Sequence, residues 1–316
     1  MAKTCYQFSD QPSVAVAISG LPQSYARQWK IFEAPAYTKI PLEIIFCKDL
    51  SRMPKTATRC LSGNYKSLPW KLTVSENSQG EPERIFFYAP YFMSFLGLRI
   101  ALLPYLKRRI AAAGGFSMLG AAFHYRRKNV ILCGGPGAGK TRLLLEAVAR
   151  GAEFLGDNEL AVSGEGKIWG LFRDIELRFA TARDTIFWQK LRGRQQWHLR
   201  FYRWISSVSG HKISFNVLIH PRELGIDEGT GGPEGKAVFV YLNGDGPKMN
   251  IPAETIVQGL ADYERGYRKM FGGLIYPESF FQMAARNLAA FANRSGCWQL
   301  PSKSTVDEIF EIISRD

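Results

Sequence analysis

Long apolar runs are missing from this sequence. The best candidate, residues 92–106, is interrupted by Arg99 and followed by Lys107, whereas a membrane-spanning helix needs about 18 to 20 predominantly apolar residues. We therefore expect no transmembrane segment, and we interpret residues 92–106 as an amphipathic helix that packs on the core rather than on a membrane. The N-terminal residues also lack the charged and apolar regions of a secretory signal, which predicts a cytoplasmic protein.

Paired cysteines and clustered histidines are missing as well. The five cysteines are odd in number, far apart and never in a CxxC pair, so neither a disulfide framework nor a zinc site is indicated. His198, His211 and His220 have no metal-ligand spacing. Acidic residues are scarce, because 28 Asp and Glu face 41 Lys and Arg, and the formal net charge is +13. This charge favours anionic partners such as a nucleotide, an acidic peptide, nucleic acid or lipid head groups, without choosing among them.

The chain is long enough for two domains with an apolar core. It has 316 residues, of which 46% are hydrophobic. Residues 6–88 alternate short apolar runs with clusters of Pro, Gly, Ser and Asn, a pattern typical of short strands and turns, and the pattern becomes helical over residues 90–113. We expect a smaller β-rich domain at residues 1–110 and a larger α/β domain at residues 111–316.

The larger domain combines strands and helices. Two apolar runs, residues 116–125 and 129–135, predict buried strands, and the 3.6-residue period from Thr141 predicts a helix that Gly151 ends. Further along the chain we expect a strand and hairpin up to residue 172, a mobile glycine-rich loop at 225–236, a strand at 237–243, and helices at 252–270, 278–292 and 306–314.

Residues 134–141, GGPGAGKT, match the phosphate-binding pattern G-x-x-x-x-G-K-[ST] between an apolar strand and a helix. Glycines let backbone N–H groups turn toward phosphate oxygens, and the helix N-terminus adds its positive dipole. Lys140 offsets charge on the β- and γ-phosphates, and the Thr141 hydroxyl can ligate Mg²⁺. A glycine-rich turn without a ligand is the competing interpretation. The predicted nucleotide-binding residues are Gly135, Pro136, Gly137, Ala138, Gly139, Lys140 and Thr141.

Asp157 follows Lys140 by only 17 residues, whereas the acid associated with Mg²⁺ in most P-loop proteins ends a distant strand. The block ILCGGPGAGKTRLLLEAVARGAEFLGDNELAV, residues 131–162, resembles the catalytic domain of HPr kinase/phosphorylase and related serine kinases, in the phosphoenolpyruvate-carboxykinase-like superfamily. The resemblance extends in outline over residues 114–300. It implies a P-loop kinase fold that uses ATP and Mg²⁺, with Asp157 as the base for the acceptor hydroxyl or as a Mg²⁺ ligand. A turn-forming aspartate before a hairpin is the alternative.

The segment IELR, residues 175–178, is similar to a segment of the same family that reads lEvRG, although Phe179 stands where glycine is expected. On this basis Glu176 is a candidate metal ligand together with Thr141 and Asp157. Arg178 is a candidate catalytic residue, with Asp157 and Lys140, because arginines neutralise charge in phosphoryl transfer. A solvated pair on a strand is the alternative for Glu176 and Arg178.

The sequence also departs from the family pattern. Asn158 replaces a second aspartate and is followed by Glu159, and Leu119 takes the place of a supporting histidine. His124 lies five residues later, on the opposite face of an unbroken strand, so we expect it to be a surface or packing residue unless the strand is bulged. Without that histidine we expect an untuned pKa for Asp157, and we do not expect phosphorylase activity.

Residues 183–222 carry eight basic residues against the single acid Asp184, interleaved with aromatic residues. Three interpretations compete: a lid that binds the acceptor, an amphipathic helix with a solvated basic face and an aromatic core face, and a nucleic-acid surface, which lacks any known fingerprint here. The basic residues are Arg183, Lys190, Arg192, Arg194, Arg200, Arg203, Lys212 and Arg222.

Together these features predict an ATP-dependent kinase that transfers the γ-phosphoryl group to a hydroxyl, with serine as the favoured acceptor. The hydroxyl would belong to a peptide, a protein or a small molecule. The positive net charge of the protein would favour an acidic acceptor. The alternatives are a nucleotide-gated regulator that transfers nothing and a nucleic-acid-associated NTPase. The sequence leaves open the acceptor, the preference among ATP, GTP and ADP, and whether the protein forms a homo-oligomer.

Overall fold

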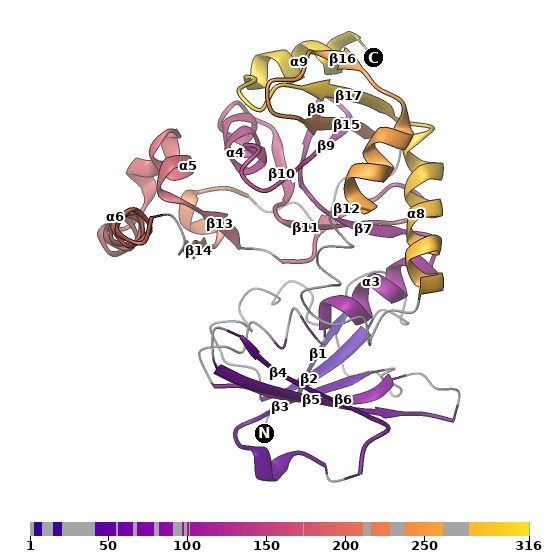
Figure 1. The fold of residues 1–316 in the computed structure, drawn as a ribbon. Coiled ribbons are helices and arrows are strands. Elements are labelled where there is room, and N and C mark those ends of the chain that lie inside the picture. The colour runs from indigo at the N-terminus through magenta and orange to yellow at the C-terminus, as the bar shows by residue number, and fades with distance from the viewer. Residues whose placement is uncertain are drawn as a thin grey trace. The chain divides into compact units, whose positions relative to one another are not determined.

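The computed structural model describes residues 3–7, 15–20, 42–54, 56–65, 68–78, 82–90, 97, 100, 102–172, 174–210, 216–227, 237–261 and 278–315. The chain divides into two compact units (Figure 1). The first covers Met1–Ile110 with Phe271–Pro277, and the second covers Ala111–Met270 and Glu278–Asp316.

The first unit contains a six-stranded mixed sheet in the order β1-β2-β3-β6-β5-β4. Strands β2, β3 and β6 run parallel to one another, and the remaining pairs are antiparallel. The short strands predicted over residues 6–88 are confirmed by β2 to β6. The strand bounds are β1 Lys3–Gln7, β2 Ala15–Ser19, β3 Glu43–Cys47, β4 Arg59–Tyr65, β5 Leu68–Glu76 and β6 Pro82–Tyr88, with a 3₁₀ turn at Leu50–Arg52.

A helix follows this sheet. Of the helix predicted over residues 90–113, the structure describes α3 at Leu103–Ala112, and most of residues 91–101 lie outside the described residues. No helix in the described part of the chain is long and apolar enough to cross a membrane.

The second unit is built around a six-stranded sheet in the order β10-β8-β9-β15-β17-β16. Its centre is parallel, since β9, β15 and β17 run in one direction. Strands β8 and β16 pair antiparallel with β9 and β17, and β10 pairs antiparallel with β8. The bounds are β8 Ala121–Tyr125, β9 Lys128–Gly134, β10 Glu153–Gly156, β15 Ala237–Leu242, β16 Met249–Asn250 and β17 Gly296–Leu300.

Helices cover both faces of this sheet, and successive side chains of β9 point alternately to the two faces. Val130 and Leu132 join one buried cluster with α4 (Lys140–Ala149) and α9 (Val306–Arg315). Ile131 and Cys133, on the opposite face, join a second cluster with α8 (Glu278–Ala292) and the helical residues 253–261. The second unit is therefore an α/β layered structure, and the helices predicted near α4, α8 and α9 are confirmed. Of the helix predicted at 252–270, residues 262–270 lie outside the described residues, as does most of the loop at 225–236.

The second unit contains two further, small sheets. The first has the order β12-β11-β7, with β7 at Phe116–Leu119, β11 at Glu159–Val162 and β12 at Ile168–Gly170. The second pairs β13, Ile175–Leu177, with β14, Val217–Ile219.

Residues 116–125 do not form the single strand that their apolar run predicts. The chain leaves the three-stranded sheet after Leu119 and enters the six-stranded sheet at Ala121. A second crossing runs the other way, from β10 to β11 through Asp157 and Asn158, and the Gly120 N–H donates to the Asn158 carbonyl at 2.8 Å. A side chain at Gly120 would place its Cβ 2.9 Å from the Leu132 carbonyl oxygen, so the break occurs at a residue that only glycine fits.

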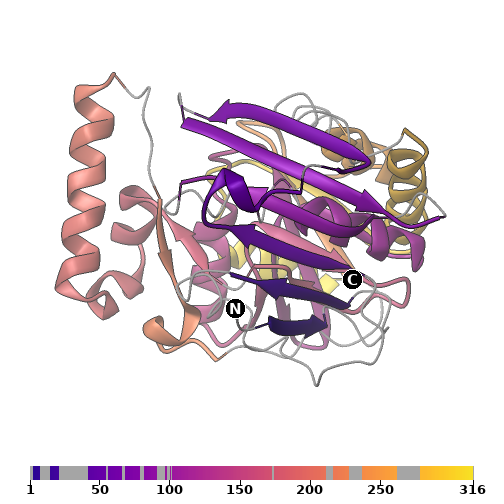
Figure 2. The same cartoon turned by 90° about the horizontal axis from the view of Figure 1, so that it is seen from below.

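After β13 the chain forms a small helical region. It consists of α5 (Phe179–Arg183), a 3₁₀ helix at Ile186–Lys190 and α6 (Gly193–Val208), and a second 3₁₀ helix, Pro221–Leu224, follows β14. Within its unit α6, the long salmon helix in Figure 2, lies at the edge and away from the large sheet.

Candidate functional site

The predicted phosphate loop joins β9 to α4 at one end of the large sheet. Gly134, Gly137 and Gly139 have φ angles of 138°, 81° and 93°, in the region that glycine adopts at no steric cost. Gly139 is the N-cap of α4, and no side chain caps this end. Because the first N–H groups of a helix have no partner within the helix, this end can donate to the oxygens of a bound phosphate.

Lys140 lies over the loop that precedes it. Its Nζ donates to the carbonyl of Gly134 at 2.8 Å and to that of Gly135 at 3.0 Å. Burial lowers the pKa of the ammonium group from its ordinary value. The lysine head therefore lies within the loop, where an incoming phosphate oxygen could replace the two carbonyl contacts.

Asp157 lies beside the first turn of α4. The Thr141 hydroxyl is 3.1 Å from Asp157 Oδ1 and 3.2 Å from Oδ2, so it donates to this carboxylate. Only 1% of Asp157 is exposed. The structure thus brings together the loop and the aspartate that follows it by 17 residues, and it assigns Asp157 to the crossing between two sheets rather than to an ordinary hairpin turn.

The backbone around Asp157 fixes its position. Strand β10 has an irregular register between Phe154 and Gly156, where it pairs with β8, and such a bulge redirects the residues that follow it. A Cβ on Gly156 would lie 2.5 Å from the Gly170 Cα, so two backbone segments meet directly before Asp157. The direction of its side chain is therefore set by strand pairing.

Burial raises the pKa of Asp157 to about 7. The Thr141 hydrogen bond acts in the opposite direction, while the nearby Glu176 carboxylate raises the pKa further. The expectation of an untuned carboxylate is wrong, because the fold itself removes Asp157 from water and no histidine is needed for the shift.

Glu176 and Arg178 belong to one hydrogen-bonded chain of side chains. Asn216 donates through Nδ2 to Glu176 Oε2 at 2.8 Å, and its Oδ1 accepts from Arg178 Nε at 3.1 Å. Glu176 is half-buried on β13 and acts electrostatically on Asp157, whereas Arg178 is exposed. Asn216 has no sequence motif, and only the pairing of β13 with β14 reveals its position beside Glu176 and Arg178.

Among the described residues, no histidine and no second acidic side chain is hydrogen-bonded to the Asp157 carboxylate, although the Glu159 N–H donates to the Asp157 carbonyl at 3.0 Å. Leu119 pairs across the sheet with Glu159, and His124 Nδ1 lies 3.0 Å from Asn129 Oδ1 near the other end of β8. His124 is thus a half-buried packing residue, as expected, although the strand is broken and the argument from an unbroken strand fails. Asn158 adopts a left-handed φ of 67°, which turns the chain into β11.

The donor set of this site fits a hard cation that also takes oxygen ligands from a nucleotide. Within the described ranges, no group of three or more His, Cys, Asp or Glu side chains could hold a metal ion alone. The Thr141 hydroxyl and the Asp157 and Glu176 carboxylates supply oxygen atoms, which Mg²⁺ prefers together with phosphate oxygens and water.

Of the four aromatic residues of α6, only Tyr202 packs against the buried core, so the expected aromatic core face is wrong for the other three. Trp197, Phe201 and Trp204 are 57%, 38% and 60% exposed, and their rings stack on one another along the helix. The only buried residue of α6 is Leu199. The lid and nucleic-acid interpretations stay predictions.

The strand next to the phosphate loop lacks an acid. Strand β15 runs parallel to β9 and ends opposite Gly134, and Asn243 follows it. The acid near the loop therefore comes from Asp157, on the other side of β9, as the sequence spacing suggested.

Comparison with protein-family models and with curated proteins finds no match for this chain.

Proposed function

We propose that this chain is an ATP-dependent kinase of the HPr-kinase-like type, which transfers the γ-phosphoryl group to a hydroxyl, with serine as the favoured acceptor. One observation carries the proposal: the buried carboxylate of Asp157 touches Thr141 in the first turn of the helix that the phosphate loop begins. The group that would accept a proton is thus hydrogen-bonded to the helix turn that directly follows the phosphate-binding loop.

The loop would hold the nucleotide. Backbone N–H groups of Gly135 and of residues 137–141 donate to phosphate oxygens, and Lys140 exchanges the Gly134 and Gly135 carbonyls for the β- and γ-phosphates. Pro136 and Ala138 complete the turn between the glycines. Positioning and electrostatic stabilisation account for most catalysis in this class of reaction.

Asp157 would accept the proton of the acceptor hydroxyl while the new O–P bond forms and the bond from the γ-phosphorus to the β,γ-bridging oxygen breaks, which releases ADP. A general base works best when its pKa lies near the operating pH, and the pKa of Asp157 is raised to about 7.

The Thr141 hydroxyl and the Glu176 carboxylate would hold Mg²⁺, which supplies positive charge to the nucleotide phosphates when bound, and Asp157 would be a ligand in the alternative in which it does not act as the base. Arg178, which Asn216 ties to Glu176, would donate to the transferring group.

The same features support transfer over the two alternatives. A nucleotide switch needs an ionised carboxylate for Mg²⁺, but it gains nothing from a carboxylate whose pKa burial has raised toward neutrality. A nucleic-acid-associated NTPase would be expected to carry its acid at the end of the strand beside the loop, where Asn243 stands.

The test compares the wild-type protein with Lys140→Ala and Asp157→Asn. Each is incubated with Mg²⁺, γ-labelled ATP and an arrayed library of peptides that contain Ser, Thr or Tyr, alongside a panel of small alcohols. We expect label on hydroxyl acceptors with the wild type, and a loss of about 10² to 10⁴ in rate with Asp157→Asn, the usual contribution of a positioned base.

Calorimetry provides the control for this test. Asp157→Asn should still bind ATP through the loop, whereas Lys140→Ala should bind it more weakly. A wild type that binds ATP and changes conformation but labels no acceptor would identify a switch instead, and equal labelling by Asp157→Asn would remove this residue from the mechanism.

A further inference from the structure

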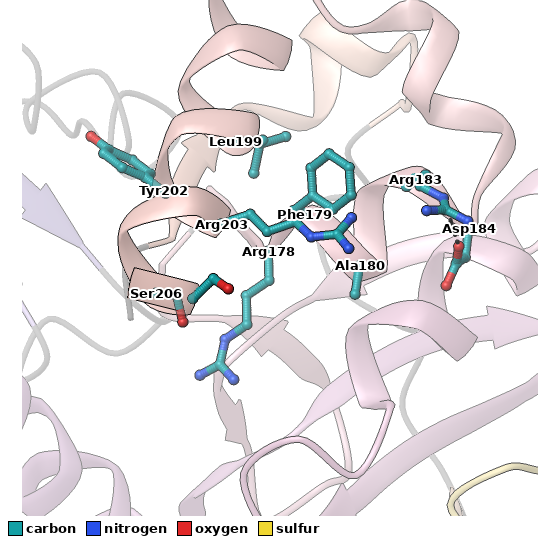
Figure 3. A pocket seen from close by; sticks show the side chains of 10 residues that line it. Arg178, Phe179, Ala180, Arg183, Asp184, Leu199, Tyr202, Arg203 and Ser206 are labelled. Carbon is teal, nitrogen blue, oxygen red and sulfur yellow. Dashed lines mark ion pairs between the residues drawn. The ribbon is translucent and has the colours of Figure 1, made fainter. Parts of the chain in front are cut away.

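A pocket of about 640 Å³ opens between α5 and α6, next to the chain of side chains that ends at Glu176 (Figure 3). Three arginines line it, Arg178, Arg183 and Arg203, against the single acid Asp184. Figure 3 shows Arg178, Arg203 and Ser206 on one side of the pocket and Arg183 with Asp184 on the other. The lining therefore carries an excess of positive charge.

This charge is only partly neutralised by the protein. Arg183 Nε lies 3.8 Å from Asp184 Oδ1, which is a weak contact. Among the described residues no carboxylate pairs with Arg178 or Arg203: Arg178 contacts Asn216, and the Arg203 guanidinium lies 4.6 Å from the centre of the Phe179 ring. Guanidinium N–H groups can form two parallel hydrogen bonds with a carboxylate or a phosphate, so these arginines can still bind an anion.

The rest of the lining combines apolar and aromatic side chains with two serines, Ser206 and Ser207. Phe179 and Leu199 form part of the wall, and Tyr202 adds a second ring. The volume exceeds what an inorganic phosphate needs and is typical of sites for small organic ligands. The lining therefore fits an organic anion, that is, a carboxylate or phosphate group attached to an apolar body.

Arg178 connects the pocket to the candidate catalytic site. Arg178 lines the pocket, and Asn216 links its Nε to the carboxylate of Glu176, which acts on Asp157. Phe179, which stands where the kinase family has glycine, supplies the ring under Arg203 and so builds a wall of this pocket. The pocket is thus a feature of this chain's own sequence.

We propose that this pocket binds an anionic group of the acceptor and holds the acceptor hydroxyl toward Asp157. The second half of the statement rests on the proposed kinase function, whereas binding of the organic anion does not. Arg203 and Arg183 act as specificity-determining residues, and the acceptor is a molecule or peptide segment with a carboxylate or phosphate beside an apolar group.

Binding is tested by calorimetry with phenyl phosphate, benzoate and inorganic phosphate as probes. The variants are Arg203→Met and Arg183→Met, and the matched control is Arg194→Met, which removes the same charge from an exposed position of α6 outside the pocket. We expect phenyl phosphate or benzoate to bind about tenfold or more weakly to Arg203→Met, the loss that a charge-assisted hydrogen bond produces, and to bind Arg194→Met as it binds the wild type.

Inorganic phosphate separates the pocket from the phosphate loop, since Lys140→Ala should weaken phosphate binding at the loop and leave the probe affinity of the pocket unchanged. If each of the three probes bound Arg203→Met with the same affinity as the wild type, the proposal would be overturned. An equal loss in Arg194→Met would also overturn it, because the effect would then be one of overall charge.

The role toward the acceptor is tested with any hydroxyl compound that the labelling screen identifies. Arg203→Met should raise the acceptor KM and leave the KM for ATP unchanged, and phenyl phosphate should compete with the acceptor. If the chain transfers no phosphoryl group, the kinase proposal fails, but the calorimetry still tests whether the pocket binds an organic anion. An unchanged acceptor KM in Arg203→Met would refute the acceptor role alone.

Discussion

Asp157 is a residue at which stability and chemistry oppose each other. The fold removes its carboxylate from water and gives it one hydroxyl donor, Thr141, so ionisation is costly in the folded state. Its pKa is raised from 3.8 to about 7. The folded protein therefore holds a proton at Asp157 that the unfolded chain releases between these two values, and stability falls as pH rises through this window.

Asp157→Asn should accordingly stabilise the metal-free protein at pH 8, because the amide keeps the contact with Thr141 without a buried charge. One pKa unit corresponds to about 1.4 kcal/mol, so the gain is at most about 4 kcal/mol above pH 7 and should shrink toward pH 4. Urea unfolding at pH 5 and pH 8 in the presence of a chelator measures it. Asp245→Asn, which removes an exposed carboxylate, is the control, and a gain that does not change with pH would contradict the assigned shift.

At the scale of elements, the site depends on strands that leave one sheet for another. Gly156 precedes Asp157, and the backbone of Gly156 lies against the backbone of Gly170 in β12. Gly156→Ala would place a Cβ 2.5 Å from the Gly170 Cα, and the backbone must move to accommodate it. We expect a loss of about 1 to 3 kcal/mol in the free energy of unfolding, typical of overpacking.

Gly135→Ala is the matched control for this measurement, since its Cβ would meet nothing within 4 Å. Denaturant unfolding should separate the two variants clearly. If Gly156→Ala were as stable as Gly135→Ala, the close approach of β10 and β12 would not exist in solution.

Helix α6 should be anchored by one buried leucine and not by its tryptophans. Leu199 is 1% exposed and joins the cluster that contains α4, whereas Trp204 is 60% exposed. Leu199→Ala should cost about 2 to 5 kcal/mol, the range for a buried leucine, while Trp204→Gln should change stability by about 0.5 kcal/mol or less. Thermal unfolding followed by far-UV circular dichroism checks both, and comparable losses would mean that the tryptophan is covered.

Local patterns predicted the elements around the phosphate loop, and pairing between distant segments decided the rest. The loop, α4 and the alternation of β9 follow from residues next to one another in the chain, so the sequence was sufficient for them. The break at Gly120 and the burial of Asp157 depend on which sheet each strand joins, which no short window contains. Trp197, Phe201 and Trp204 misled the interpretation of α6 because large rings are usually buried.

At the scale of the whole molecule, the division into two units predicts a selective response to nucleotide. A ligand that binds the folded state at about 100 times its Kd stabilises it by about 2.7 kcal/mol. Because the loop belongs to the second unit, ATP with Mg²⁺ should raise only the calorimetric transition of that unit. Lys140→Ala should abolish the shift. A shift of both transitions, or of neither, would contradict the assignment of nucleotide binding to the second unit alone.

The paired crossings at Gly120 and Asp157 also determine where the chain can change its length. Each inserted residue reverses the alternation of a strand, and here two strands are tied together by the hydrogen bond from Gly120 to Asn158. One extra residue between Phe154 and Leu160 would turn the carboxylate away from Thr141 while leaving every side chain of the loop intact. The turn at residues 163–167 joins β11 and β12 within one sheet and lies outside the two crossings, so insertions and deletions in natural or engineered variants should be better tolerated there than at the crossings.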